Sequence, residues 1–241
     1  MTASTVIWHD VECGSYDADL ALWRELSADL DGPVLDVGAG TGRVTLDLAR
    51  RGREVIALDA DPDLVAALRE RAAGLPVRAV CADARDFALD TEVALVIVPM
   101  QTLQLLGGAE GRRAFLRCAH RHLRPGGLLA AALADATDGQ PAEGDALGAL
   151  PDIREIDGTV YASHPVGVRR ENGGVVIQRI RETVDPQGVR TAEDDEIRLD
   201  DLDAATVAAE AAPLGFTPRP ALAVAPTDEY VGSEVVVLCR R

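Results

Sequence analysis

Short apolar runs alternate with helix-like segments along the first half of the chain. Each run is bounded by turn residues and is too short for a buried helix, which favours strands buried on both faces. The runs cover residues 34–37, 54–59, 77–81, 93–98 and 128–133. Between them, apolar positions recur at helical spacing, as in residues 62–71 and 109–123. This alternation predicts an α/β fold with a doubly wound, mostly parallel sheet and ligands at the carboxyl ends of its strands.

The pattern changes at Ala136, where loop composition begins. Three later segments, 159–170, 175–184 and 189–199, are separated by turn residues and predict an inserted antiparallel β-meander. A helical segment at 202–214 and two strands, near 218–225 and 234–239, then return to the sheet.

The first 32 residues hold one clear helical pattern. Leu20, Trp23, Leu26 and Leu30 recur at helical spacing, and Ser15 is a candidate N-cap, so we expect one helix from Ser15 to about Leu30. Residues 1–14 show no clear period. We expect three parts: a helical segment over 1–32, an α/β core over 33–135 and 200–241, and an inserted loop and meander over 136–199.

The amino-acid composition excludes several classes of chemistry and of binding partner. All 24 basic residues are arginine, which excludes Schiff-base lysine chemistry and the P-loop. A net charge of −16 disfavours nucleic acid and anionic membranes as partners. The four cysteines are scattered, no charged-then-apolar leader opens the chain, and no apolar stretch could span a bilayer. We therefore expect a cytoplasmic protein with reduced thiols.

A glycine turn follows the first strand. Gly38, Gly40 and Gly42 alternate, and this spacing differs from the Gly-x-Gly-x-x-Gly of dinucleotide-binding folds. By itself such a turn is either a ligand site or purely structural. Asp36 stands inside the strand, where a carboxylate is costly unless it is hydrogen-bonded. It either holds amides of the turn or faces an ammonium group of a ligand.

Two further acids end strands. Asp59 is placed to accept both hydroxyls of a ribose, and the alternative is a cap for the next helix, a role that Asp61 fills better. Asp83 is placed to accept from the exocyclic amine of a purine, and the alternative is a simple surface acid.

These features together resemble a known family. Residues 34–42, Asp59, Asp83-Ala84, the strand 93–99 and residues 123–127 resemble successive motifs of class I S-adenosylmethionine-dependent methyltransferases. The resemblance implies a seven-stranded sheet whose last strand is antiparallel, with S-adenosyl-L-methionine as cofactor. It implies cofactor contacts for the following residues: Asp36, Gly38, Ala39, Gly40 and Gly42 at the methionine part, Asp59 at the ribose, Ala60, Asp83 and Ala84 at the adenine, and Pro99 and Met100 at the sulfonium. Arg43 is a further candidate, for the cofactor carboxylate.

The segment after the fourth strand separates branches of this family. Amino-directed nucleic-acid enzymes carry an acid or Asn there, then Pro-Pro-aromatic, whereas this chain has Val98-Pro99-Met100-Gln101. We therefore expect methyl transfer to an O or N of a small-molecule acceptor. The alternative is a cofactor-binding protein of the same fold that catalyses another reaction or serves as a structural or regulatory subunit.

The sequence gives weaker signals for the residues that would bind the methyl acceptor. His164, in the meander, is the best candidate for a general base, and the alternative is a packed or solvated histidine. Tyr16, Gln101, Thr102 and Tyr230 are candidates for the pocket rim, whereas His120 and His122 are expected at the surface. The acids 193–196 are a candidate metal site or, as we favour, a solvated strand edge. The exposed edge of the meander is also a candidate homodimer surface.

Overall fold

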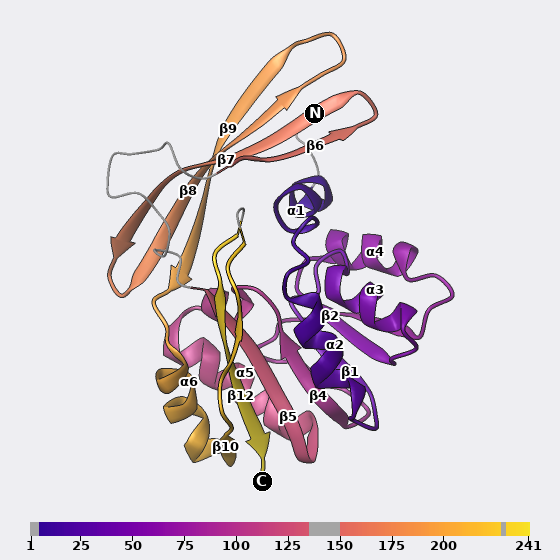
Figure 1. Cartoon of the computed structure of the whole chain (residues 1–241), viewed down its shortest axis with the longest axis vertical. Helices are drawn as coiled ribbons and strands as arrows, with labels where there is room; N and C mark the ends of the chain where they lie inside the picture. Colours follow the sequence, from indigo (N-terminus) through magenta and orange to yellow (C-terminus); the bar gives the residue numbers. More distant parts are fainter. Residues whose placement is uncertain (1–4, 135–149, 228–229) are drawn as a thin grey trace.

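The computed structural model describes residues 5–134, 150–227 and 230–241. Two sheets dominate it (Figure 1). The larger has the strand order β10-β12-β5-β4-β1-β2-β3, with β11 paired to β12, and the smaller has the order β6-β7-β8-β9. The predicted loop at 136–149 lies outside the described residues.

The larger sheet is the predicted doubly wound core. Its central strands pair in parallel, and β12 is antiparallel to β5 and β10, which confirms the expected closing pair. The strands are β1 (Val34–Val37), β2 (Val55–Asp59), β3 (Val77–Cys81), β4 (Val93–Val98), β5 (Leu123–Ala134), β10 (Phe216–Pro218), β11 (Leu222–Val224) and β12 (Ser233–Arg240). Seven strands form the expected sheet, and β11 is one short addition.

Helices cover both faces of this sheet because its central strands are apolar on both sides. All six residues of β4 are buried: Val96 and Val98 pack into the cluster that contains Phe115, while Leu95 packs into the cluster that contains Trp23. The helices are α2 (Leu20–Ala28), α3 (Arg43–Arg50), α4 (Pro62–Arg71), η1 (Thr102–Leu105), α5 (Gly108–His122), α6 (Ala204–Ala211) and η2 (Ala212–Leu214).

The amino-terminal segment differs from its prediction. The expected single helix from Ser15 begins instead at Leu20, and residues 5–13, where no period was visible, form a second helix, α1 (Thr5–Cys13). The N-cap position of α2 is taken by Asp19, and the Ser15 hydroxyl instead lies 2.8 Å from the hydroxyl of Tyr230. The helix α1 lies between the two sheets (Figure 1).

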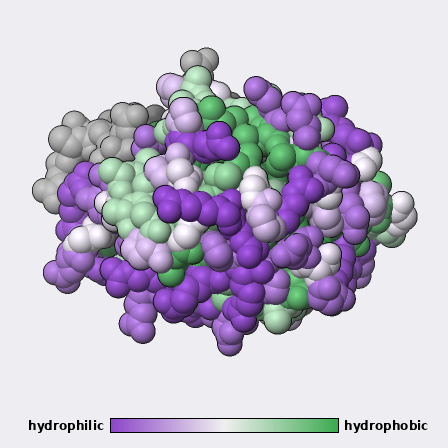
Figure 2. All heavy atoms as spheres, turned by 90° about the horizontal axis from the view of Figure 1, so that it is seen from below, coloured by the Kyte–Doolittle hydropathy of each residue, from purple (hydrophilic) through white to green (hydrophobic). Residues whose placement is uncertain are grey.

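The smaller sheet, called the roof sheet below, consists of β6 (Asp152–Ile156), β7 (Thr159–Glu171), β8 (Gly174–Val184) and β9 (Arg190–Asp200). The antiparallel meander is confirmed, with β6 as a fourth strand. It lies above the carboxyl ends of the parallel strands (Figure 1), while the face opposite it is largely hydrophilic with scattered apolar patches (Figure 2).

Asp200 anchors the last roof strand to the core. Its carboxylate accepts a hydrogen bond from the Gly108 amide at 2.8 Å and pairs with Arg112, whose guanidinium also binds Glu210 at 2.8 Å. Its carbonyl accepts from Gln104 Nε2 at 3.2 Å. Asp200 thereby joins the roof sheet to η1 and to the start of α5.

Candidate functional site

The glycine turn is held against the neighbouring strand. The amides of Gly38 and Ala39 both donate to the Leu58 carbonyl, at 2.8 and 3.0 Å. Gly38, Gly40 and Gly42 have φ angles of +72°, +54° and +101°, a region that favours glycine. The turn therefore has one fixed shape, set by backbone contacts.

Asp59 reaches this turn from the end of β2. Its Oδ2 accepts from the Gly40 amide at 2.8 Å, and its Oδ1 accepts from the Asp61 amide at 3.0 Å. The cap of α4 is Asp61, whose carboxylate accepts from the amides of Asp63 and Leu64. Each Asp59 oxygen retains a second lone pair for an external donor.

Asp36 lies fully buried beneath the same turn. Its Oδ2 accepts from Thr45 Oγ1 at 2.6 Å, whereas its Oδ1 has no partner among the described residues. Burial raises the pKa of Asp36 to about 6, although the Thr45 hydrogen bond and the charge of Arg43 oppose the shift. The carboxylate thus holds no turn amide.

The third strand ends beside the second, since Asp59 is in register with Cys81. Ala60 is exposed, Ala84 is buried, and Asp83 is exposed with both carboxylate oxygens held by Arg85, at 2.9 and 2.6 Å. These hydrogen bonds keep the pKa of Asp83 below its usual range. The Asp83 carboxylate must therefore share its acceptors between Arg85 and any ligand.

The loop after β4 lies against the glycine turn. Thr102 Oγ1 donates to the Pro99 carbonyl at 3.1 Å, and a Cβ on Gly38 would lie 2.5 Å from Thr102 Cγ2. Met100 has a φ of +55°, a left-handed conformation that is strained for a side chain of this kind. Gln101 follows it, half-buried. The structure thus brings four predicted residues, 99–102, to the same edge as the turn.

Comparisons with known proteins identify the segment that forms this edge. Residues 34–127 match a family model described as "Methyltransferase domain". The "Cypemycin N-terminal methyltransferase" of a Streptomyces species is 36% identical over 130 residues, which is 54% of this chain and 53% of that protein. Over residues 34–127 these matches confirm the predicted resemblance to class I S-adenosylmethionine-dependent methyltransferases. The cofactor predicted for this domain is confirmed as that of its family.

Solved structures resemble the whole chain. An amino pentose methyltransferase of calicheamicin biosynthesis from Micromonospora echinaspora, with S-adenosylmethionine bound, is 20% identical with a TM-score of 0.72, over 100% of this chain and 99% of that chain. A sugar N-methyltransferase from Streptoalloteichus is 20% identical with a TM-score of 0.73, over 98% and 91%. At this identity the likeness shows the fold. The chain spans about half the length of the curated relative, and no helix among the described residues is long and apolar enough to cross a membrane.

The methyltransferase domain is bound to the segment before it by Arg43. The guanidinium contacts both Asp19 oxygens and donates to the Tyr16 carbonyl at 2.9 Å. The Arg43 side chain is almost buried, and its N–H donors are taken up by the Asp19 carboxylate. The geometry therefore disfavours our expectation that Arg43 binds the cofactor carboxylate.

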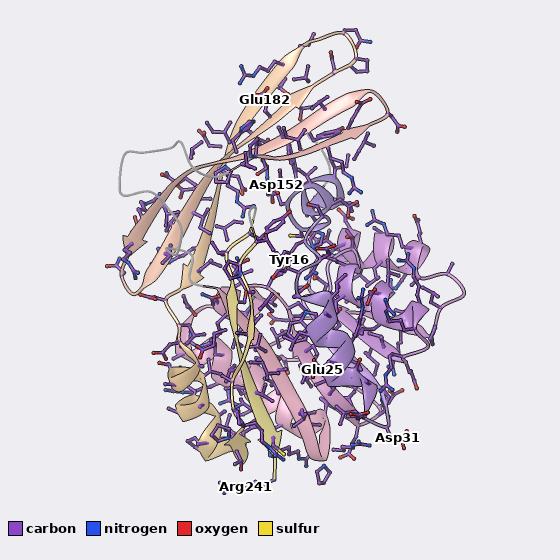
Figure 3. All side chains as sticks on the ribbon, viewed as in Figure 1. Tyr16, Glu25, Asp31, Asp152, Glu182 and Arg241 are labelled. Carbon is purple, nitrogen blue, oxygen red and sulfur yellow. The ribbon has the colours of Figure 1, made fainter. Side chains whose placement is uncertain are left out.

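Two predicted rim residues meet although they are far apart in sequence. The rings of Tyr16 and Tyr230 are 5.0 Å apart and inclined by 61°, and the Arg43 guanidinium lies 5.0 Å from the Tyr16 ring. Figure 3 shows Tyr16 between the roof sheet and the core, below Asp152. Burial, then the nearby charge of Asp19, raises the pKa of Tyr16, so its hydroxyl stays protonated.

The geometry disfavours His164 as the base. Its neighbour Ser163 donates to Glu12 of α1 at 2.9 Å, and Tyr161 packs edge-on against Trp8 of α1 at 5.7 Å. Successive strand residues alternate between faces, so His164 lies on the face of the roof sheet that is turned away from α1. No comparison tests His164, and its role stays a prediction.

The roof face that meets α1 is charged. Glu12, almost buried, pairs with Arg179 at 3.2 Å and with Arg181 at 2.8 Å, and Arg181 also pairs with Asp195 at 3.0 Å. The acid run 193–196 is thus partly neutralised by arginines. Within the described ranges, no group of three or more histidine, cysteine or acidic residues could hold a metal ion.

One histidine that we did not select lies against the glycine turn. A Cβ on Gly40 would lie 2.0 Å from Nε2 of His9, so the imidazole of α1 covers the middle of the glycine turn. His9 lies in residues 1–14, where the sequence shows no clear period, so no pattern marked its position. By contrast, His122, expected at the surface, is buried and stacks on Phe87 at 5.2 Å.

A separate hollow of about 440 Å³ lies between residues 85–86 and α5. Its lining is Arg85, Asp86, Ala114, Arg117, Cys118 and Arg121. It contains no predicted site residue, so we do not assign it to the cofactor.

Proposed function

We propose that this chain is a cytoplasmic S-adenosylmethionine-dependent methyltransferase that transfers a methyl group to a nitrogen or oxygen of a small-molecule acceptor. One observation carries the proposal: the glycine turn, Asp59 and the strained loop at Met100 converge on one edge of the sheet beneath a polar roof. Two structural neighbours are an amino pentose methyltransferase and a sugar N-methyltransferase, which supports an amino sugar as the first acceptor class to test.

The residues present fit the cofactor. Asp36 Oδ1 is a buried acceptor that no described residue pairs with, suited to an ammonium group, and Asp59 keeps two lone pairs for vicinal hydroxyls. Gly38, Ala39, Gly40 and Gly42 would shape the methionine subsite, Ala60, Asp83 and Ala84 the adenine subsite, and Pro99 and Met100 the surroundings of the sulfonium. When bound, the cofactor supplies an electrophilic methyl group on a positively charged sulfur.

The protein's own task in this reaction is alignment and exclusion of water. We assign Tyr16 and Tyr230, with Gln101 and Thr102, to the rim that orients the acceptor. Segment 1–32 and the insertion 136–199 would cover the site. An amine acceptor attacks as the neutral base, and so needs no proton removed when it arrives deprotonated, whereas a hydroxyl usually needs a general base.

The ribose contact gives the first prediction. Asp59→Ala should weaken S-adenosylmethionine binding about 10- to 100-fold, because hydrogen bonds to a charged acceptor contribute about 1.5–3 kcal/mol. Calorimetry measures the affinity. Asp61→Ala is the matched control: it removes the α4 cap at a cost of about 1 kcal/mol in stability and should leave affinity unchanged. Unchanged binding in Asp59→Ala would remove the ribose assignment.

Transfer itself is tested with labelled cofactor and a panel of amino sugars, each paired with its hydroxyl counterpart. Label in the amine members supports N-transfer, and label in the hydroxyl members supports O-transfer. Tight cofactor binding without label in any small molecule would favour the alternative, a cofactor-binding subunit. Nucleic acid is not expected to accept label.

The oligomeric state is a further part of the proposal. The roof sheet ends in β6 and β9, and Ile153 on β6 is 61% exposed. This edge is the candidate homodimer surface. Light scattering on the wild type and on Ile153→Glu measures it: a dimer that the substitution converts to monomer supports the assignment, and a wild-type monomer contradicts it.

A further inference from the structure

His9 is the part of α1 that lies closest to the glycine turn. The distance of 2.0 Å between Nε2 and a Cβ built on Gly40 means that the imidazole edge occupies the space in front of this residue. Gly40 is also the residue whose amide binds Asp59. His9 and Asp59 therefore approach the same point of the turn, one from the covering helix and one from the sheet.

A chain of hydrogen bonds fixes the tautomer of His9. Arg71 donates to both oxygens of Asp10, at 2.8 and 2.6 Å, so this carboxylate is ionised and can only accept. Thr41 Oγ1 gives its single proton to Asp10 Oδ1 at 2.7 Å. Its oxygen, 3.3 Å from His9 Nδ1, must then accept from Nδ1–H. Nε2 consequently carries the lone pair.

The imidazole is also neutral at physiological pH. Burial lowers the pKa of His9, and the positive charge of Arg71 acts in the same direction, while Asp10, Asp59 and Glu12 raise it by less. Among the described residues no donor reaches Nε2. A neutral imidazole adds no positive charge near a sulfonium ion and offers one acceptor to a hydroxyl.

We propose that His9 Nε2 accepts a hydrogen bond from a ribose hydroxyl of the bound nucleoside, so that Asp59 and His9 hold the sugar from opposite sides. This inference rests on the proposed function. It also gives α1 a second role, because Glu12, three residues after His9, binds Arg179 and Arg181 of the roof sheet. One helix thus contacts the cofactor at one point and the acceptor cover at another.

Two substitutions separate the ring nitrogens. His9→Asn keeps an N–H near the Nδ1 position and loses Nε2, whereas His9→Gln places an amide oxygen within reach of the Nε2 position and loses the fixed donor to Thr41. We expect His9→Asn to bind S-adenosylhomocysteine about 10-fold more weakly, and His9→Gln to lose less. Thermal unfolding of both variants shows whether the loss is one of folding.

The decisive measurement uses S-adenosylhomocysteine and its 2′-deoxy and 3′-deoxy analogues in calorimetry. If His9 binds one hydroxyl, wild type and His9→Asn bind the corresponding deoxy analogue equally, because the partner of Nε2 is absent from both. An equal loss for all three ligands would overturn the ribose contact. A wild type that binds none of them would instead contradict the proposed function itself.

Binding should also fall with acid, since protonated Nε2 no longer accepts. Asp36, with a pKa of about 6, also binds a proton as the pH falls, and Asp10, Asp59, Glu12 and Arg71 face the imidazole. The contribution of His9 is therefore the difference between wild type and His9→Gln from pH 5 to 8. Identical pH profiles for the two proteins would contradict a titrating contact.

Discussion

The carboxyl edge of the central sheet and the roof sheet above it are held together by different kinds of contact. At the edge, backbone amides and carbonyls fix the glycine turn, and one buried carboxylate, Asp36, lies among aliphatic strands. On the roof, the contact with α1 consists of charged side chains, Glu12 against Arg179 and Arg181. The shape of the turn is set by backbone contacts, which do not depend on the identity of neighbouring side chains. The roof contact depends on charged side chains, and these can change without disturbing the turn.

The largest effect is expected from breaking the roof contact. Glu12→Ala leaves Arg179 and Arg181 partly buried without their shared carboxylate, which should lower the free energy of unfolding by about 2–4 kcal/mol. Urea unfolding measures it. Turnover should fall more than cofactor affinity, because the cover detaches while the turn remains.

An exposed ion pair provides the control for Glu12. Asp90 is 74% exposed in its pair with Arg78, so Asp90→Ala should leave the midpoint of urea unfolding almost unchanged. If the two variants unfold at the same urea concentration, the buried cluster does not hold the roof to α1.

A smaller effect, of opposite sign, is expected beneath the turn. The pKa of Asp36 is raised from 3.8 to about 6, so the folded state binds more protons than the unfolded state between these values, and stability falls as pH rises through them. Asp36→Asn removes the buried charge. It should stabilise the protein above pH 6 by at most about 3 kcal/mol and change little near pH 4.

The Asp36→Asn variant separates the effect of this carboxylate on stability from its effect on cofactor binding. We expect Asp36→Asn to raise the thermal midpoint at pH 8 while cofactor affinity falls, since the asparagine carries no charge for an ammonium group. A variant that is destabilised equally at pH 4 and pH 8 would show that the carboxylate is needed for the fold.

The smallest effect concerns the strained loop. Met100→Gly relieves the left-handed backbone and should raise stability by about 0.5–1 kcal/mol. The same substitution makes the backbone beside Thr102 more flexible. We therefore expect kcat to fall although the folded protein is slightly more stable. Thermal unfolding and single-turnover rates measure the two effects, and a loss of stability would show that the Met100 side chain contributes more than its backbone costs.

The core was predictable because its strands are buried on both faces. The bounds of β1 and β4, whose residues are all buried, match their predictions, since a run such as residues 93–98 has no other place in a folded chain. Asp59 and Asp61 could be told apart because one ends a strand and the other precedes proline in a helix start. Both assignments depend on local pattern alone.

The cover was less predictable because its contacts are tertiary. In α1 only Trp8 and Val11 are buried, too few to show a period, and β6 is a strand only through its pairing with β7. The face of β7 on which His164 lies is set by Ser163 and Tyr161, which contact α1. No spacing in the sequence encodes that contact.

The antiparallel pairing of β12 with β5 has a consequence for folding. Val237 lies in register with Ala130, and the entire roof sheet is made between these two segments. Closure of such distant pairs costs loop entropy and slows folding. During synthesis, we therefore expect the apolar edge of β5 to stay unpaired until residues 233–240 have been made. The strands of the roof sheet, by contrast, pair with strands next to them in the sequence. We expect the roof sheet to form its strand pairs before the central sheet is complete.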